Sequence, residues 1–186
     1  MKYFRLTTIL LVFALVTFGA FISPNPAQAA SAAEIDRDAR KALEDLYAKS
    51  TSAKAMGEKA IGILVFPGIV KGGFIVGGQY GEGALIKGGN TVAYYNSIAA
   101  SYGLQAGLQK FGYALFFMTD SALKWIDKSD GWEIGVGPSI VVVDVGAAAS
   151  MTSTTAQSDI YAFFFDQKGL MAGLGLQGAK ITRLEK

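Results

Sequence analysis

The stretch from residue 66 to residue 85, FPGIVKGGFIVGGQYGEGAL, limits what this chain can fold into more than any other part of it. It contains seven glycines among aliphatic and aromatic residues, at positions 68, 72, 73, 77, 78, 81 and 83. Its one cation is Lys71. Glycine with lysine is typical of a loop that holds a phosphate, whereas glycine between apolar residues is equally typical of kinked, closely packed strands.

The glycine spacing does not fit either common nucleotide-binding loop. A Walker loop places Gly-Lys-Ser/Thr after four intervening residues. Gly83 and Gly88 have that separation, but Gly89 and Asn90 stand where the lysine and the hydroxyl residue are needed. A dinucleotide fingerprint needs a third glycine where this chain has Ile86, and a helix after it, which the sequence does not indicate. The glycines are therefore expected in strands.

The chain contains neither histidine nor cysteine. This excludes histidine bases, serine–histidine triads, thiol nucleophiles and the usual zinc sites. Residues 127–131 resemble a calcium loop only faintly, because Pro138 stands where the bidentate glutamate belongs, so we expect a turn there. The other acidic residues are scattered, and nothing in the sequence pairs two of them for catalysis. We predict no enzymatic activity, no catalytic residue, no metal site and no cofactor.

Residues 1–29 have the pattern of a secretory signal peptide. A short basic start is followed by an apolar run over residues 6–22, and residues 27–29, Ala-Gln-Ala, have the small-x-small form that signal peptidase cleaves. The alternative is an uncleaved membrane anchor, for which the apolar run is just short. An exported chain without cysteine has no disulfides, which fits a bacterial periplasm or envelope. We predict export and a mature chain that starts at Ala30.

The mature chain carries no net charge. The full sequence has 17 lysines and arginines against 15 aspartates and glutamates. Lys2 and Arg5 lie in the leader, which has no acidic residue, so 15 of each sign remain. A neutral domain has no overall attraction to nucleic acid, and any anion must bind at a local patch. We predict no nucleic-acid partner.

The mature chain, residues 30–186, is expected to form one domain with a helical part, residues 30–60, and a β-rich part, residues 61–186. Apolar residues recur at helical steps after Ser31, which with Glu34 has the spacing of a capping box. From residue 61, short β-rich runs are separated by turn residues, which favours antiparallel sheet. We predict an α+β fold in which an N-terminal helix packs on a twisted, mostly antiparallel, barrel-like β-sheet. The helix could instead lie on a membrane, but its polar face has mixed charge, which favours packing.

The β-rich part is dense in aromatic residues. Phe116-Phe117 and Phe163-Phe164-Phe165 place rings on both faces of a strand. One face packs the core, and the other must either be covered or bind something apolar. Burial between the sheet and the helix is the interpretation that we favour.

The order of the motifs resembles the SYLF lipid-binding domain family. The matching segments are residues 64–67 (LVFP), 71–74 (KGGF), 77–83 (GGQYGEG), 103–107 (GLQAG), 135–149, 168–174 and 178–179. They cover essentially the whole mature chain. The chain departs from the family at Lys110-Phe111-Gly112, where members often carry a Thr/Ser-Asp pair.

The resemblance implies a non-enzymatic domain that binds phospholipids; eukaryotic members favour phosphoinositides, fungal members also bind actin filaments, and bacterial members are exported envelope proteins. We expect Lys71 to offer a cation to a headgroup phosphate, with the nearby amides of Gly72 and Gly73 and the ring of Phe74 helping to place the lipid. An actin-like filament is not expected as a partner of an exported bacterial protein. The alternative is a structural or protein-interaction module of the envelope with no specific lipid ligand, in which the glycines only shape the fold.

Overall fold

The computed structural model describes residues 30–127, 131–143, 158–169, 176 and 178–186, with the backbone alone at residues 74, 75, 101–106 and 169. The predicted leader lies outside the described residues, as do the parts of the family motifs at residues 144–149 and 170–174. No helix in the described ranges is long and apolar enough to cross a membrane.

The N-terminal helix α2 (Ala32–Lys49) begins at the predicted capping box. The Ser31 hydroxyl accepts a hydrogen bond from the Glu34 backbone N–H, and the Glu34 carboxylate accepts one from the Ser31 N–H at 2.8 Å. Ser50 ends this helix and caps the shorter α3 (Thr51–Gly57) through a hydrogen bond from the backbone N–H of Ala53. A single later turn forms α4 (Asp120–Leu123).

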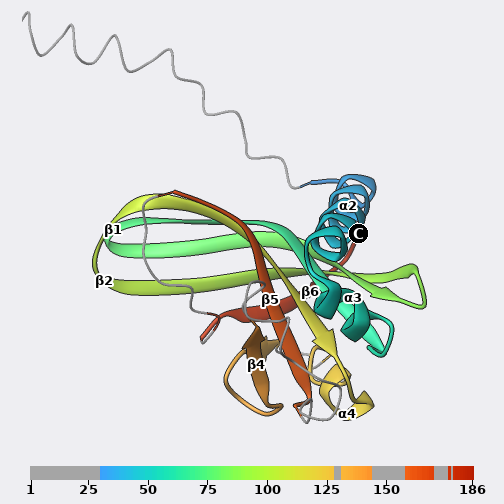
Figure 1. The fold of residues 1–186 in the computed structure, drawn as a ribbon. Coiled ribbons are helices and arrows are strands. Elements are labelled where there is room, and N and C mark those ends of the chain that lie inside the picture. The colour runs from blue at the N-terminus through green and yellow to red at the C-terminus, as the bar shows by residue number, and fades with distance from the viewer. Residues whose placement is uncertain (1–29, 128–130, 144–157, 170–175, 177) are drawn as a thin grey trace, which may run out of the picture.

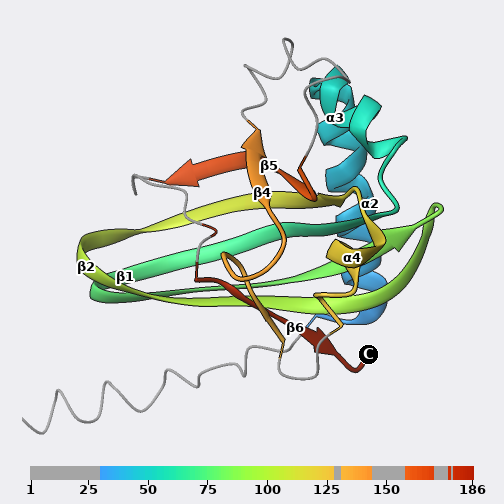
Figure 2. The same cartoon turned by 90° about the horizontal axis from the view of Figure 1, so that it is seen from below.

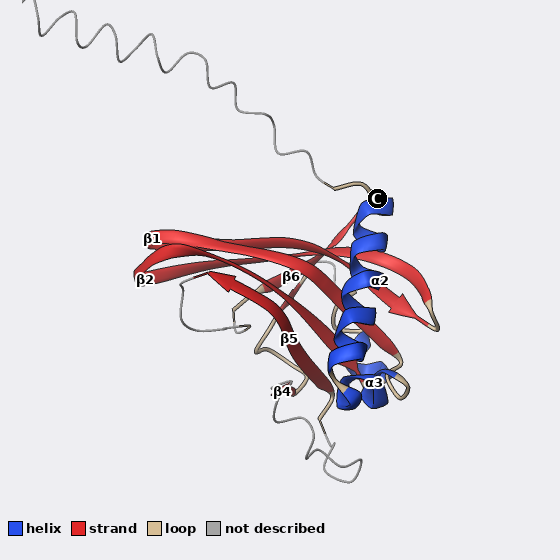
Figure 3. Cartoon of the chain, turned by 45° about the horizontal axis from the view of Figure 1, so that its top comes forward, coloured by secondary structure: helices blue, strands red, loops and turns tan. Residues whose placement is uncertain are grey.

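The strands form one strongly curled sheet. They are β1 (Gly62–Lys87), β2 (Asn90–Phe117), β3 (Trp132–Glu133), β4 (Ile140–Val143), β5 (Ile160–Gly169) and β6 (Lys180–Leu184). All pairs are antiparallel except β4 with β5. The sheet curls into a half-barrel with α2 and α3 packed on it (Figures 1 and 3). The predicted α+β class, with a helix on a mostly antiparallel, barrel-like sheet, is confirmed.

Strand β1 doubles back on itself, and its glycines make this possible. A Cβ atom on Gly83 would lie 2.4 Å from the carbonyl oxygen of Val65, and one on Gly73 would lie 2.3 Å from the Cα atom of Gly77. Side-chain carbons do not approach other atoms so closely, so only glycine lets the two halves of β1 run side by side at this spacing. The glycine-rich stretch is therefore a folded strand and not a loop.

Strand β2 follows the same course, because Gly62 pairs with Phe117 at one end and Lys87 with Asn90 at the other. Both strands turn at the same end of the sheet (Figure 2). When each half of β1 and β2 is counted separately, the described residues form eight strand segments. Their order is β4, β5, second half of β2, first half of β1, second half of β1, first half of β2, β6 and β3.

The sheet buries a core on each face. The concave face encloses a cluster that includes Leu64, Phe66, Ile69, Tyr95, Phe111, Tyr113, Phe117, Trp132 and Phe164. The convex face packs against α2 and α3 through Val65, Phe116, Phe163 and Phe165 among others. Both aromatic runs are thus buried on both sides, as the favoured interpretation predicted.

Helix α2 is also held by the turn between β1 and β2. Arg40 donates to the carbonyl oxygen of Gly89 at 2.8 Å and to the hydroxyl of Thr91 at 3.1 Å. Asp36 accepts from Arg40 Nε at 3.0 Å and from the Thr91 hydroxyl. These hydrogen bonds, the one from Arg40 foremost, hold the pKa of Asp36 below its ordinary value.

Candidate functional site

The four residues predicted to bind lipid lie on β1 just before it doubles back: Lys71, Gly72, Gly73 and Phe74. Lys71 and Gly73 face the concave side, because side chains alternate along a strand and Ile69 belongs to the concave core. Gly72 faces the convex side, where an added Cβ would lie 3.1 Å from Leu108. The backbone of Phe74 pairs with Ala106, and its side chain lies outside the described residues. The four are neighbours in sequence but do not share one face.

The register across the fold in β1 decides which side chains are neighbours there. Gly73 lies against Gly77, and a Cβ on Gly81 would lie 3.2 Å from the Cα atom of Ile69. Antiparallel partners advance by equal steps in opposite directions. Lys71 therefore lies opposite residue 79, and residue 70 lies opposite residue 80.

A polar row crosses the concave face at this point, and we call it the inner row: Gln109, Lys71 and Gln79. Gln109 on β2 is the cross-strand partner of Lys71 on its other side. Gln79 and Gln109 are only 6% and 4% exposed, yet Gln79 Nε2 and Gln109 Oε1 have no hydrogen-bond partner among the described residues. Buried amide groups without partners are uncommon in native proteins, so the inner row is an unusual polar feature in this sheet.

A second row crosses the convex face, and we call it the outer row: Lys168, Lys110, Val70, Tyr80, Ile98 and Lys180. It follows from the pairing of Lys168 with Lys110, Val70 with Lys110, Tyr80 with Ile98, and Ile98 with Lys180. Its three central side chains are exposed apolar or aromatic residues, and Leu108 and Val76 are exposed nearby. The outer row thus combines an apolar centre with lysines at both ends.

A cleft of about 690 Å³ lies between α2 and the outer row. It is lined by Ala30, Ile35, Asp38, Lys41, Ala42, Asp45, Pro67, Gly68, Val70, Tyr80, Gly81, Glu82, Lys110 and Asp166. Each of its four carboxylates forms an ion pair: Asp38 with Arg37, Asp45 with Lys41, Glu82 with Lys186, and Asp166 with Lys49. Lys110 has no ion pair among the described residues, so it supplies the uncompensated charge of the cleft.

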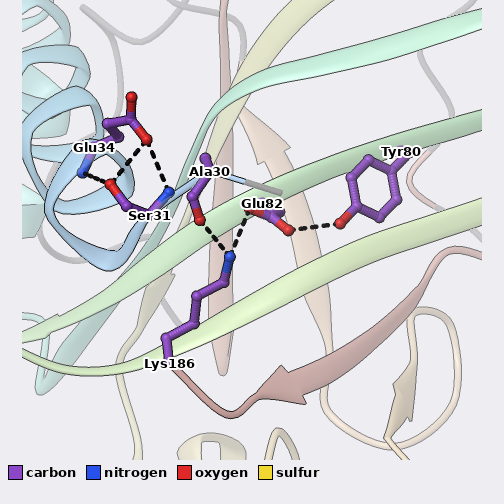
Figure 4. A network of polar contacts seen from close by, with 6 residues as sticks. All are labelled: Ala30, Ser31, Glu34, Tyr80, Glu82 and Lys186. Atoms are coloured by element: carbon purple, nitrogen blue, oxygen red, sulfur yellow. Dashed lines mark hydrogen bonds and ion pairs between the residues drawn. The ribbon is translucent and has the colours of Figure 1, made fainter. Parts of the chain in front are cut away.

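A hydrogen-bonded chain orients Tyr80 at the edge of this cleft. The Tyr80 hydroxyl donates to Glu82 at 2.7 Å, and Glu82 pairs with Lys186 at 3.2 Å. Lys186 also donates to the carbonyl oxygen of Ala30, next to the capping box of α2 (Figure 4). The tyrosine hydroxyl and the glutamate charge are thereby satisfied.

Two further carboxylates in the described ranges have structural partners. Asp127 accepts from the Tyr95 hydroxyl at 2.7 Å. Asp159 accepts from the backbone N–H and hydroxyl of Ser139, and these bonds, the backbone one first, lower the pKa of Asp159. No group of three acidic residues in the described part of the chain could hold a metal ion.

Sequence reasoning missed Gln79, Gln109 and Lys110. The alternation within each short run was visible, but the fold in β1 that brings Lys71 beside Gln79 was not. Lys110 stands where the sequence departs from the SYLF pattern, and this departure was the one signal that could have identified it.

Comparison with protein families matches residues 98–186 to the Ysc84 family, described as "Las17-binding protein actin regulator". This is the SYLF family that the motifs resemble. The match begins within β2 and includes β3, β4, β5 and β6. A search of curated proteins finds no match.

Proposed function

We propose that this protein binds phospholipid membranes and is not an enzyme, because residues 98–186 match the model of the Ysc84 (SYLF) family, a family of lipid- or actin-related binding domains. We place it in the bacterial envelope. The leader pattern of residues 1–29 and the lack of cysteine support export.

The outer row and its cleft are the proposed contact with the membrane. Val70 is 48% exposed and Ile98 46%, and together with Tyr80 they form an apolar strip that can enter the headgroup region. Lys110 and Lys168 at one end and Lys180 at the other attract the negative charge of anionic lipids. Glu133 lies beside Lys180 and weakens that end, so we assign most of the attraction to the first pair.

The observation that carries the proposal is that Lys110 lines the cleft without an ion pair among the described residues. In the described part of the chain it is the cleft cation left without a carboxylate, and it lies directly beside Val70 in the sheet. A cation next to an exposed apolar strip matches a phospholipid, because the cation can pair with the phosphate while the strip contacts the acyl chains. The concave-facing Lys71 is not needed for this contact, and its predicted headgroup role stays a prediction.

Co-sedimentation of the protein with vesicles tests this assignment. Lys110→Gln should weaken binding to vesicles that contain phosphatidylglycerol about fivefold, since one lysine near an anionic surface contributes about 1 kcal/mol. On pure phosphatidylcholine the same change should have little effect. Lys124→Gln, at the exposed end of α4, is the matched control.

The apolar strip is tested in the same assay. Burial of a whole valine side chain is worth about 1.5–3 kcal/mol, so Val70→Ser should remove about 1 kcal/mol on every vesicle composition. Val142→Ser on β4, where the valine is 58% exposed, is the control. Absence of binding to any composition would refute the proposal and favour an envelope module that contacts protein.

A further inference from the structure

One buried ion pair joins the two sides of the cleft. Lys186 pairs with Glu82 at 3.2 Å, and their side chains are only 13% and 9% exposed, whereas the side chains of the other ion pairs between described residues are at least 31% exposed. Lys186 also donates to the carbonyl oxygen of Ala30 (Figure 4). Ala30 precedes α2, Glu82 lies on β1, and both line the cleft. One lysine therefore bridges the helix side and the sheet side of the cleft.

We infer that Lys186 is an inhibitory clamp, which holds the start of α2 against β1 and keeps part of the cleft's apolar lining covered. Ile35, in the first turns of α2, lines the cleft and is only 3% exposed, while Val70 across from it on β1 is 48% exposed. When the start of α2 moves away from the sheet, Ile35 becomes accessible and enlarges the apolar strip. The effect of the clamp on lipid binding rests on the proposed membrane contact, but the clamp itself does not.

The start of α2 depends on this lysine for its polar contact with the sheet. Farther along the helix, Arg40 binds the turn between β1 and β2, and Lys49 pairs with Asp166 on β5. Residues 30–34 make no hydrogen bond or ion pair to the described part of the sheet other than the one from Lys186. Release of Lys186 therefore frees this end of the helix while the rest stays tied.

The clamp also reaches the centre of the outer row. Glu82 accepts a hydrogen bond from the Tyr80 hydroxyl at 2.7 Å. Without Lys186, the nearly buried Glu82 carboxylate would keep only this neutral partner among the described residues, and an uncompensated buried charge is strongly unfavourable. The carboxylate regains solvation by turning toward water, which releases the Tyr80 ring. We therefore expect the helix end and Tyr80 to be freed together.

Amide exchange and dye binding test the clamp without a membrane. The variants are Lys186→Met, which keeps most of the side-chain stem, and Glu82→Gln, which leaves no carboxylate without its partner. In both we expect the Ile35 amide to exchange at least tenfold faster, and the fluorescence of 8-anilinonaphthalene-1-sulfonate, a dye that reports exposed apolar surface, to rise at least twofold. Arg183→Met breaks the exposed pair with Asp127 beyond the cleft and, as the matched control, should change neither.

The same exchange experiment separates local opening from unfolding of the whole domain. Amides in the pairing of β2 with β5 should exchange at the parent's rate in both clamp variants. If the Ile35 amide and the dye fluorescence stay at the parent's values in both variants, the inference is wrong. It is equally wrong if all amides accelerate together, because the ion pair would then stabilise the whole fold and not one end of a helix.

Vesicles that contain phosphatidylglycerol test the inhibitory role. Loss of a positive charge alone weakens binding to an anionic surface. Release of a contact that holds the closed state has the opposite effect, so Lys186→Met should bind at least threefold more tightly than the parent. If it binds equally or more weakly while Lys110→Gln weakens binding as proposed, the membrane contact stands and the inhibitory role is wrong. If the parent binds no vesicle, the proposed function fails, and amide exchange with dye binding decides whether the clamp covers the cleft.

Discussion

Replacing Gly83 by alanine tests the fold of β1 most directly. The new Cβ atom would lie 2.4 Å from the carbonyl oxygen of Val65 and 2.7 Å from the ring of Phe66, which is fully buried. Overpacking usually destabilises a protein by about 1–3 kcal/mol, and a backbone carbonyl cannot turn away as a side chain can. We therefore expect a loss of about 3 kcal/mol, which is a large part of the stability of an ordinary domain.

Thermal and urea unfolding of the same variants measure this loss. A change of about 3 kcal/mol corresponds to a decrease in Tm of about 6–12 °C for a chain of this size. Gly78→Ala is the control on the same strand, because its nearest neighbour, the carbonyl oxygen of Ala99, would lie at an ordinary 3.6 Å. We expect that control to stay within about 0.5 kcal/mol of the parent. If Gly83→Ala were as stable as Gly78→Ala, the halves of β1 would not lie side by side, and Lys71 would not lie beside Gln79.

Three further predictions concern the fold. Tyr113→Phe removes the buried hydrogen bond to the Ser97 hydroxyl (2.8 Å) and should reduce the free energy of unfolding, measured in urea, by about 1–2 kcal/mol. Adding Ser97→Ala to that variant should recover part of the lost stability, because the Ser97 hydroxyl is then no longer left without its partner. If the losses of the two single variants simply added in the double variant, the two side chains would not be coupled. Ser31→Ala removes the cap of α2 and should reduce stability by about 1 kcal/mol, with faster amide exchange confined to the first turn of that helix. Because the pKa of Asp36 is lowered in the folded state, the contribution of Asp36 to stability is fully present above the ordinary pKa of 3.8 and is lost as the pH falls through the folded-state pKa. Asp36→Asn should therefore make the free energy of unfolding less dependent on pH in the acid range. An unchanged dependence on pH in that range would refute this prediction.

The elements that depend on local signals were predictable from the sequence. The capping box at Ser31 follows from hydrogen bonds within a few residues of chain, and the structure has it. The glycine stretch was recognised as strand because its lysine and its helix are in the wrong place for a nucleotide loop. Neither inference required knowledge of the tertiary contacts between helices and strands.

The fold of β1 back on itself could not be predicted in the same way. Hairpins are usually marked by Asn-Gly or Asp-Gly turns, but β1 turns at residues 74–76, which are Phe, Ile and Val. The flexible positions flank this turn as Gly72-Gly73 and Gly77-Gly78, so the signal is spread over seven residues. The apolar residues at this turn instead have the pattern of the middle of a strand. The inner and outer rows depend on this turn, and they were therefore invisible in the sequence.

The register shifts in β1 decide what Val70 and Lys71 can do. The pairing of β1 with β2 shifts between Phe66 and Ile69, so the faces of residue 70 and residue 71 are set after that irregularity and not by simple counting from the start of the strand. A slip of one residue would turn Lys71 to the convex face and Val70 to the concave one. In the observed register the glycine-rich strand places an apolar residue, Val70, on the convex face and a cation, Lys71, on the concave face with Gln79 and Gln109. Adjacent residues thus point to opposite faces of the sheet.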